Sequence, residues 1–140
     1  MADAQLQFEA NEYSEILEGL WLGPMPSKLD FVKSLHDNAG VKAIVSLQTN
    51  IDLLTLGFEW PQMETLLRRG GITNAVRVPI LDFDEHSLVH LLDEAIDAVH
   101  QLRDVQGLST YVHCTAGVNR APTVMIGYLI AHHGLDLDEA

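Results

Sequence analysis

The chain has 140 residues, 47% of them hydrophobic and 20% charged, which suits one globular domain with a buried core of its own. Eight Lys and Arg against 20 Asp and Glu give a formal net charge of −12, which disfavours nucleic acid and anionic membranes as partners. The single cysteine excludes an internal disulfide and zinc sites built from several cysteines. With no signal-peptide pattern at the N-terminus, we expect a soluble cytoplasmic protein that needs no cofactor.

The first half of the chain carries signals for a hairpin, two helices and a buried strand, after a polar segment at 1–12 that we expect to be flexible. Gly19 divides an apolar run into two short strands, and Pro61 is typical of the first turn of a helix. The expected elements are a hairpin over 15–22, a helix over 28–38, a strand over 41–47, a loop with helical turns over 48–60 and a helix over 61–69.

The second half alternates strands and helices more clearly. Ser87 is expected to cap the longest helix, whose apolar residues form one stripe, and Gly134 to end the last one. The expected elements are a strand over 75–80, a polar loop over 82–86, a helix over 87–103, a strand over 108–113, a turn over 114–120 and a helix over 121–133. This order predicts an α/β fold with a central, mostly parallel twisted sheet flanked by helices.

The only cysteine lies where a strand passes through a turn into a helix, which is where open α/β sheets bind ligands. Successive backbone N–H groups of the turn and the start of the helix form a nest of phosphate size. Cys114 is therefore a candidate nucleophile, and Arg120 can clamp two phosphoryl oxygens. The residues expected to form the phosphate-binding loop are Thr115, Ala116, Gly117, Val118, Asn119 and Arg120.

The pattern His113-Cys114-x-x-Gly117-x-x-Arg120 resembles the signature of the protein tyrosine phosphatase superfamily, and the short chain resembles its dual-specificity branch. The resemblance implies a single phosphatase domain over 13–140, with Cys114 as nucleophile and Arg120 as the clamp. It also implies a supporting role for His113 behind the loop. The substrate that it implies is a protein phosphorylated on tyrosine, serine or threonine, which would pass through a cysteinyl-phosphate intermediate.

A general acid is needed to protonate the leaving group. In the family this residue commonly precedes the nucleophile by about thirty positions, and the resemblance assigns the role to Asp82, with Asp84 as the alternative. Phe83 and Trp60 are candidates for the wall of the substrate cleft. His86 and His90 have the spacing of a metal pair but no third ligand in motif, so we expect no metal.

The sequence is also compatible with two other functions. The loop and the segment Asp82-Phe83-Asp84 are similar to plant starch-phosphate and laforin-type glucan phosphatases, so a phosphoglucan is the second candidate substrate. Ala121 replaces the Ser or Thr that usually follows the loop arginine, and the family usually extends further at the C-terminus. Because of these departures, a third possible function is that of a phosphate-binding module that does not catalyse hydrolysis. The oligomeric state is left undetermined.

Overall fold

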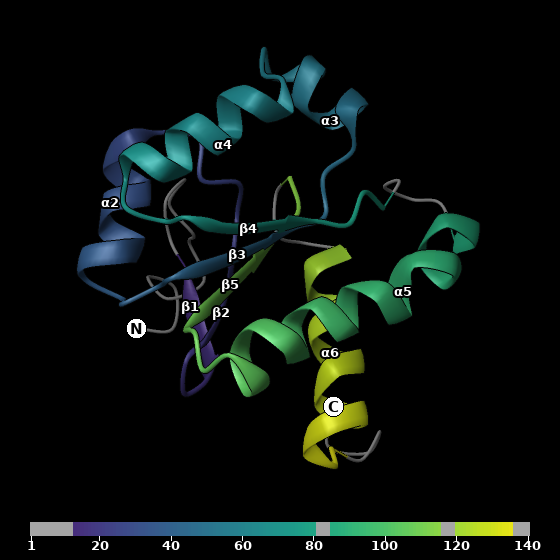
Figure 1. The fold of residues 1–140 in the computed structure, drawn as a ribbon. Helices are drawn as coiled ribbons and strands as arrows, with labels where there is room; N and C mark the ends of the chain where they lie inside the picture. Colours follow the sequence, from purple (N-terminus) through teal and green to yellow (C-terminus); the bar gives the residue numbers. More distant parts are fainter. Residues whose placement is uncertain (1–12, 81–84, 116–119, 136–140) are drawn as a thin grey trace, which may run out of the picture.

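The computed structural model describes residues 13–80, 85–115 and 120–135. It is built on a five-stranded sheet in the order β1-β2-β5-β3-β4 (Figure 1). Only β1 runs antiparallel to its neighbour, and the other three strand pairs are parallel. The expected α/β fold with a mostly parallel sheet is therefore confirmed. The strands are β1 Ser14–Leu17, β2 Leu20–Gly23, β3 Ala43–Ser46, β4 Asn74–Arg77 and β5 Thr110–His113.

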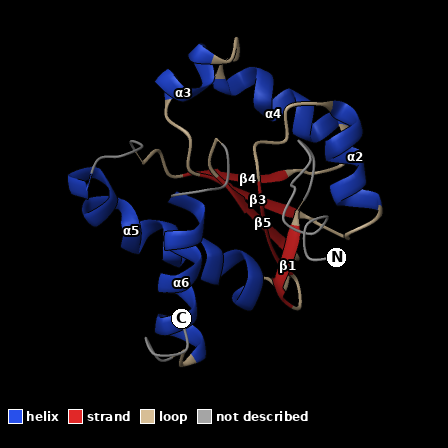
Figure 2. Cartoon of the chain, turned by 180° about the vertical axis from the view of Figure 1, so that it is seen from behind, coloured by secondary structure: helices blue, strands red, loops and turns tan. Residues whose placement is uncertain are grey.

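Helices cover both faces of the sheet (Figures 1 and 2). The pair α2 and α4 lies on one face, and α5 with α6 lies on the other. The helices are α2 Leu29–Asp37, α3 Asn50–Thr55, α4 Trp60–Arg69, α5 Glu85–Val99 and α6 Arg120–His133, with a π-helical turn, η1 His100–Val105, directly after α5. Among the described residues, no helix is long and apolar enough to cross a membrane.

The central strands are apolar on both sides because helices bury both faces. In β3, Ala43 and Val45 pack in the core beneath α5 and α6, whereas Ile44 packs against α2 and α4. In β5, Val112 belongs to the first core and Tyr111 to the second. This two-sided burial fixes the strand that ends at the cysteine, so its position is set by the whole fold and not by the loop alone.

Several element boundaries differ from the sequence-based expectation. The longest helix begins at Glu85, so Ser87 lies inside it and the prediction that Ser87 is the N-cap is wrong. That helix ends as a π-turn over 100–105, in which Leu102 keeps the apolar stripe buried. The strands predicted over 41–47, 75–80 and 108–113 are shorter in the structure and form over 43–46, 74–77 and 110–113. The expected flexible segment, 1–12, lies outside the described residues.

Candidate active site

Cys114 follows the last residue of β5 at the carboxyl edge of the sheet, and only 2% of its surface is exposed. Backbone hydrogen bonds hold the chain on both sides of it. The Leu47 N–H donates to the His113 carbonyl at 2.9 Å, and the Met25 N–H donates to the Thr115 carbonyl at 3.2 Å. The segments that follow β2 and β3 thus hold the backbone on both sides of Cys114, which lies after a strand as the sequence predicted.

Arg120 is the first residue of α6, and its guanidinium is almost fully buried, with 3% exposed. One nitrogen, Nη1, donates to Asp52 Oδ2 at 2.6 Å and to the Ile80 carbonyl at 2.7 Å. The other, Nη2, donates to Thr115 Oγ1 at 3.2 Å. One arm of the guanidinium is therefore held by the scaffold, and the other reaches the residue next to Cys114. Such a planar fork can bind two oxygens of a phosphoryl group.

Asp52 is tied to its own helix as well as to Arg120. It forms a capping box with Thr49, in which the Asp52 N–H donates to Thr49 Oγ1 at 3.2 Å and the Thr49 N–H donates to Asp52 Oδ2 at 2.8 Å. Burial raises the pKa of the Asp52 carboxyl, but hydrogen bonds from Arg120 and Thr49 and the charge of Arg120 outweigh burial and lower it. The carboxylate is therefore charged at neutral pH, and it balances the buried guanidinium.

His113 lies behind the loop and is completely buried. Its Nδ1–H donates to the Cys114 carbonyl at 2.9 Å, which fixes the ring orientation and the tautomer. Burial lowers the pKa of His113 to about 4; the hydrogen bond to Cys114 opposes this shift, and the charge of Arg120 adds to it. The ring is neutral at pH 7, so the supporting role predicted for it is compatible with the geometry.

Gln48 connects the end of β3 to the start of the loop. Its Nε2 donates to Thr115 Oγ1 and to the sulfur of Met25, both at 3.2 Å. Thr115 thus receives hydrogen bonds from Gln48 and Arg120 at one hydroxyl. Its side chain is therefore locked at the point where the loop leaves the sheet.

The structure brings together some of the predicted site residues. Cys114, Thr115, Arg120 and His113 form one connected cluster through the contacts above. Trp60 is the first residue of α4 and is half-buried against Met63 and its neighbours, with the Arg77 guanidinium 5.4 Å from its ring centre. The remaining predicted residues lie outside the described part of the chain: Asp82, Phe83, Asp84, Ala116, Gly117, Val118 and Asn119.

Sequence reasoning missed Gln48, Thr49 and Asp52. A local signal was present, because Thr49-x-x-Asp52 has the spacing of a capping box and marks the start of a helix. The bond from Asp52 to Arg120 joins residues 68 positions apart. No local pattern indicates such a contact, so only the fold reveals it.

A sequence model of the family described as "Dual specificity phosphatase, catalytic domain" matches residues 20–140. Laforin from Mus musculus is 30% identical over an alignment 131 positions long, which covers 86% of this chain and 39% of laforin. The amyloplastic phosphoglucan phosphatase DSP4 from Castanea sativa is 33% identical over 82% of this chain and 30% of that protein. Human dual specificity protein phosphatase 14 is 33% identical over 72% of this chain and 43% of that protein. The chain thus spans less than half the length of these three relatives.

Solved structures share the fold at lower sequence identity. PTP-2 phosphatase from Cydia pomonella superposes with a TM-score of 0.73 at 17% identity, over 92% of this chain and 75% of that one. The human tyrosine phosphatase-like serine/threonine/tyrosine-interacting protein gives a TM-score of 0.70 at 20% identity, over 92% and 79%. These likenesses place the five-stranded sheet and its helices among phosphatase-like folds.

Proposed function

The chain belongs to the dual specificity phosphatase family, and on that premise we propose that it is a cysteine-dependent phosphomonoesterase of phosphoproteins. The observation that carries the proposal is the Arg120 guanidinium, buried and bound to Asp52, with its second arm on Thr115 beside the only cysteine. Residues 13–140 would form the catalytic domain. The substrates would be proteins phosphorylated on tyrosine, serine or threonine.

In the proposed reaction, the Cys114 thiolate attacks phosphorus in line with the leaving oxygen. A sulfur–phosphorus bond forms while the phosphorus–oxygen ester bond breaks. The loop from Thr115 to Arg120 supplies backbone N–H groups to the equatorial oxygens, and the guanidinium of Arg120 holds two of them. Because Nη1 is already fixed by Asp52 and Ile80, the fork needs little reorganisation as charge develops.

Proton transfer accompanies both steps. Asp82 would give its proton to the departing alkoxide or phenoxide, and Asp84 is the alternative donor. Water then attacks the cysteinyl phosphate, the same carboxylate takes the water proton, and inorganic phosphate and the thiolate are released. The carbonyl of Ile80, two residues before Asp82, accepts a hydrogen bond from Arg120. Arg120 is thus hydrogen-bonded to the backbone just before the segment that carries Asp82 and Asp84.

Replacement of the nucleophile tests this mechanism. We expect Cys114→Ser to abolish phosphate release from phosphotyrosine and phosphothreonine peptides while phosphate binding is kept, because a hydroxyl is a far poorer nucleophile. Steady-state phosphate release and peptide binding measured on the same preparations check it. Residual activity within tenfold of the unmodified chain would exclude Cys114 as the nucleophile.

A phosphoglucan is the second candidate substrate, because laforin and the phosphoglucan phosphatase DSP4 are 30% and 33% identical over more than four fifths of this chain. Trp60 would then contribute to a platform on which sugar rings stack. Phosphate release from phosphorylated amylopectin and from phosphopeptides, compared at equal enzyme, separates the two. Faster release from the glucan, with a loss in Trp60→Ala confined to that substrate, would reverse the ranking.

A further inference from the structure

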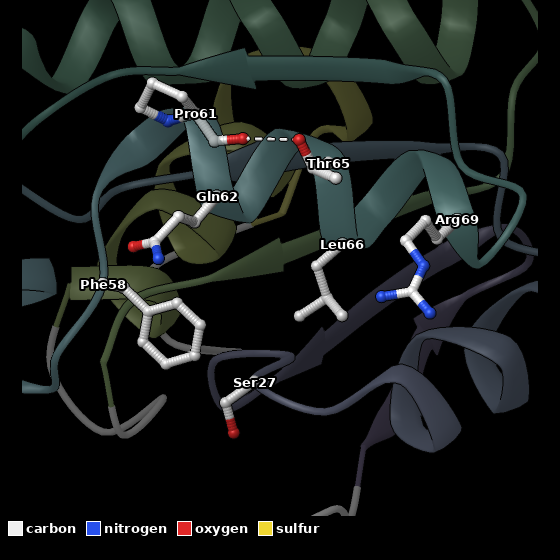
Figure 3. Close-up of a pocket in the computed structure, with 7 residues that line it drawn as sticks. All are labelled: Ser27, Phe58, Pro61, Gln62, Thr65, Leu66 and Arg69. Carbon is white, nitrogen blue, oxygen red and sulfur yellow. Dashed lines mark hydrogen bonds between the residues drawn. The ribbon is translucent and has the colours of Figure 1, made fainter.

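A hollow of about 380 Å³ lies between α4 and the segment that joins β2 to α2 (Figure 3). One face of α4 supplies most of its wall, and Ser27 closes it from the opposite side. We call it the α4 pocket. The residues that line it are Ser27, Phe58, Pro61, Gln62, Thr65, Leu66 and Arg69.

The α4 pocket combines an apolar wall with hydrogen-bond donors. Figure 3 shows the Phe58 ring and the Arg69 guanidinium at opposite ends, with Leu66 between them. The Gln62 carbonyl oxygen accepts from the Glu59 N–H at 2.7 Å, which leaves the amide nitrogen as its donor. In the described ranges 13–80, 85–115 and 120–135, no partner is found for that nitrogen, the Ser27 hydroxyl or the Arg69 guanidinium.

The charge of the α4 pocket is opposite to that of the chain. Among the described residues that line it, Arg69 is the only charged one and none carries a carboxylate, although the whole chain has 20 Asp and Glu against 8 Lys and Arg. A donor-rich hollow with a cationic end and an apolar end is complementary to an anionic group on a short carbon stem. The carboxylate of glutamate and the phosphate of a phosphorylated residue share this chemistry.

The α4 pocket is coupled to the phosphate loop through Met25. The Met25 N–H donates a hydrogen bond to the Thr115 carbonyl. Ser27 follows Met25 by two residues, which limits the distance between the Cα atoms of Met25 and Ser27 to about 7 Å. Met25 also packs with Leu53 and Met63 in the buried cluster against which Phe58 lies. An extended peptide spans about 3.3 Å per residue, so its third to fifth residue from the reacting phosphate reaches a site about 10–16 Å away.

We propose that the α4 pocket is a substrate subsite for an anionic side chain three to five residues from the residue that is dephosphorylated. Arg69, with Ser27 and Gln62, binds the carboxylate or phosphate, and the side-chain stem lies on Phe58 and Leu66. The inference rests on the proposed phosphoprotein activity. A phosphopeptide fits better than a glucan. A neutral sugar chain could stack on Phe58, but it would leave the Arg69 guanidinium at the other end of the pocket without a counter-charge.

The test compares phosphotyrosine peptides that differ at positions three to five, carrying glutamate, phosphoserine or glutamine. Binding is measured to the Cys114→Ser chain by fluorescence anisotropy, and kcat/KM is measured with the unmodified chain. We expect the glutamate peptide to be bound and hydrolysed about three- to tenfold better than the glutamine peptide. Arg69→Gln should bring that ratio to about one. Arg68→Gln is the matched control, because Arg68 is exposed on the same helix but does not line the α4 pocket.

Each outcome decides a different point. A preference for phosphoserine over glutamate would assign the subsite to a second phosphate, and the reverse would assign it to a carboxylate. Equal binding of all three peptides, or an equal loss in Arg68→Gln, would overturn the proposal. Displacement of the peptide by a neutral malto-oligosaccharide, lost in Phe58→Ala, would overturn it in favour of a sugar site. A glutamate preference in binding without phosphate release would uphold the subsite and contradict the proposed hydrolysis.

Discussion

Arg120 depends on Asp52 for its place in the site. A guanidinium with 3% of its surface exposed requires a charged partner, because an unpaired buried charge costs about 3–5 kcal/mol. Asp52 supplies that charge at 2.6 Å and is itself held by Thr49 at the start of α3. Asp52 therefore positions Arg120, the proposed clamp, although it need not touch the substrate.

We expect Asp52→Asn to lower kcat/KM by about tenfold, because the amide keeps an acceptor oxygen but removes the charge that orients Nη1. The loss should fall mainly on kcat, since the clamp contributes most as charge develops on the phosphoryl group. Steady-state kinetics on a phosphotyrosine peptide measure it, with thermal unfolding as the check that the variant is folded.

A double-mutant cycle separates positioning from general destabilisation. In an Arg120→Lys background, Asp52→Asn should cost much less than tenfold, because the geometry that it supports is already lost. If Asp52→Asn costs the same factor in both backgrounds, Asp52 acts independently of Arg120. Thr49→Val is a milder companion, since it removes only the hydroxyl side of the capping box.

At the scale of elements, α2 and α4 meet at Gly70, immediately after the last residue of α4. A methyl group at Gly70 would lie 2.8 Å from Val32 Cβ, closer still to Val32 Cγ1, and 3.4 Å from the Lys33 nitrogen. Val32 is fully buried and β-branched, so it cannot rotate away. The φ angle of Gly70 is −85°, an ordinary value, so close approach and not backbone conformation requires glycine here.

We therefore expect Gly70→Ala to lower the free energy of unfolding by about 1–3 kcal/mol, as overpacked cores do. Urea unfolding measures the change. Val32→Ala is destabilising in its own right, but it makes room for the added methyl group. The double variant should consequently be less destabilised than the sum of the two single variants. Strict additivity would show that α2 and α4 do not meet in this way.

The sequence predicted the elements that depend on local pattern and missed those that depend on the fold. The apolar runs that contain β3 and β5 were recognisable because a strand covered on both faces has no polar side. The helix that follows Cys114 was recognisable from its Gly134 stop. The π-turn η1 was not recognisable from the sequence. Leu102 continues the apolar stripe of the helix, and only the backbone hydrogen-bond pattern changes.

The candidate site divides in the same way. Cys114 and Arg120 could be proposed as site residues because the family motif is local in sequence. The contact from Asp52 to Arg120 could not, since it exists only when α3 is folded over the end of the sheet. Trp60 stays a prediction for the cleft wall, because its half-buried ring beside Arg77 is compatible with a place in the core or in a cleft. Aromatic residues suit core and ligand platform alike, so residue type alone does not distinguish them.

For the whole molecule, one buried group beside the proposed nucleophile links stability to pH in the range below neutrality. His113 is completely buried, and its pKa is about 4 because of that burial, with the Cys114 hydrogen bond opposing and the Arg120 charge reinforcing the shift. An unfolded histidine has a pKa of about 6.5. Between these values the unfolded chain binds a proton that the folded chain does not, so stability falls as pH decreases.

The full shift corresponds to about 3 kcal/mol of stability, present above pH 6.5 and lost as pH falls towards 4. This is a large share of the roughly 5–15 kcal/mol that stabilises an ordinary domain. Most carboxylates titrate below pH 5, so the formal charge of −12 changes little between pH 7 and 5 apart from the histidines. That interval isolates the histidine contribution.

We expect the free energy of unfolding to decrease from pH 7 to pH 5, and His113→Asn to flatten that decrease. The asparagine amide can still donate to the Cys114 carbonyl but has no proton to gain. The variant should be less stable than the unmodified chain at pH 7, because the smaller side chain leaves a cavity. At pH 5 the difference in the free energy of unfolding between the variant and the unmodified chain should be smaller. Urea unfolding at pH 7, 6 and 5 measures both slopes, and equal slopes would show that His113 does not carry the acid sensitivity.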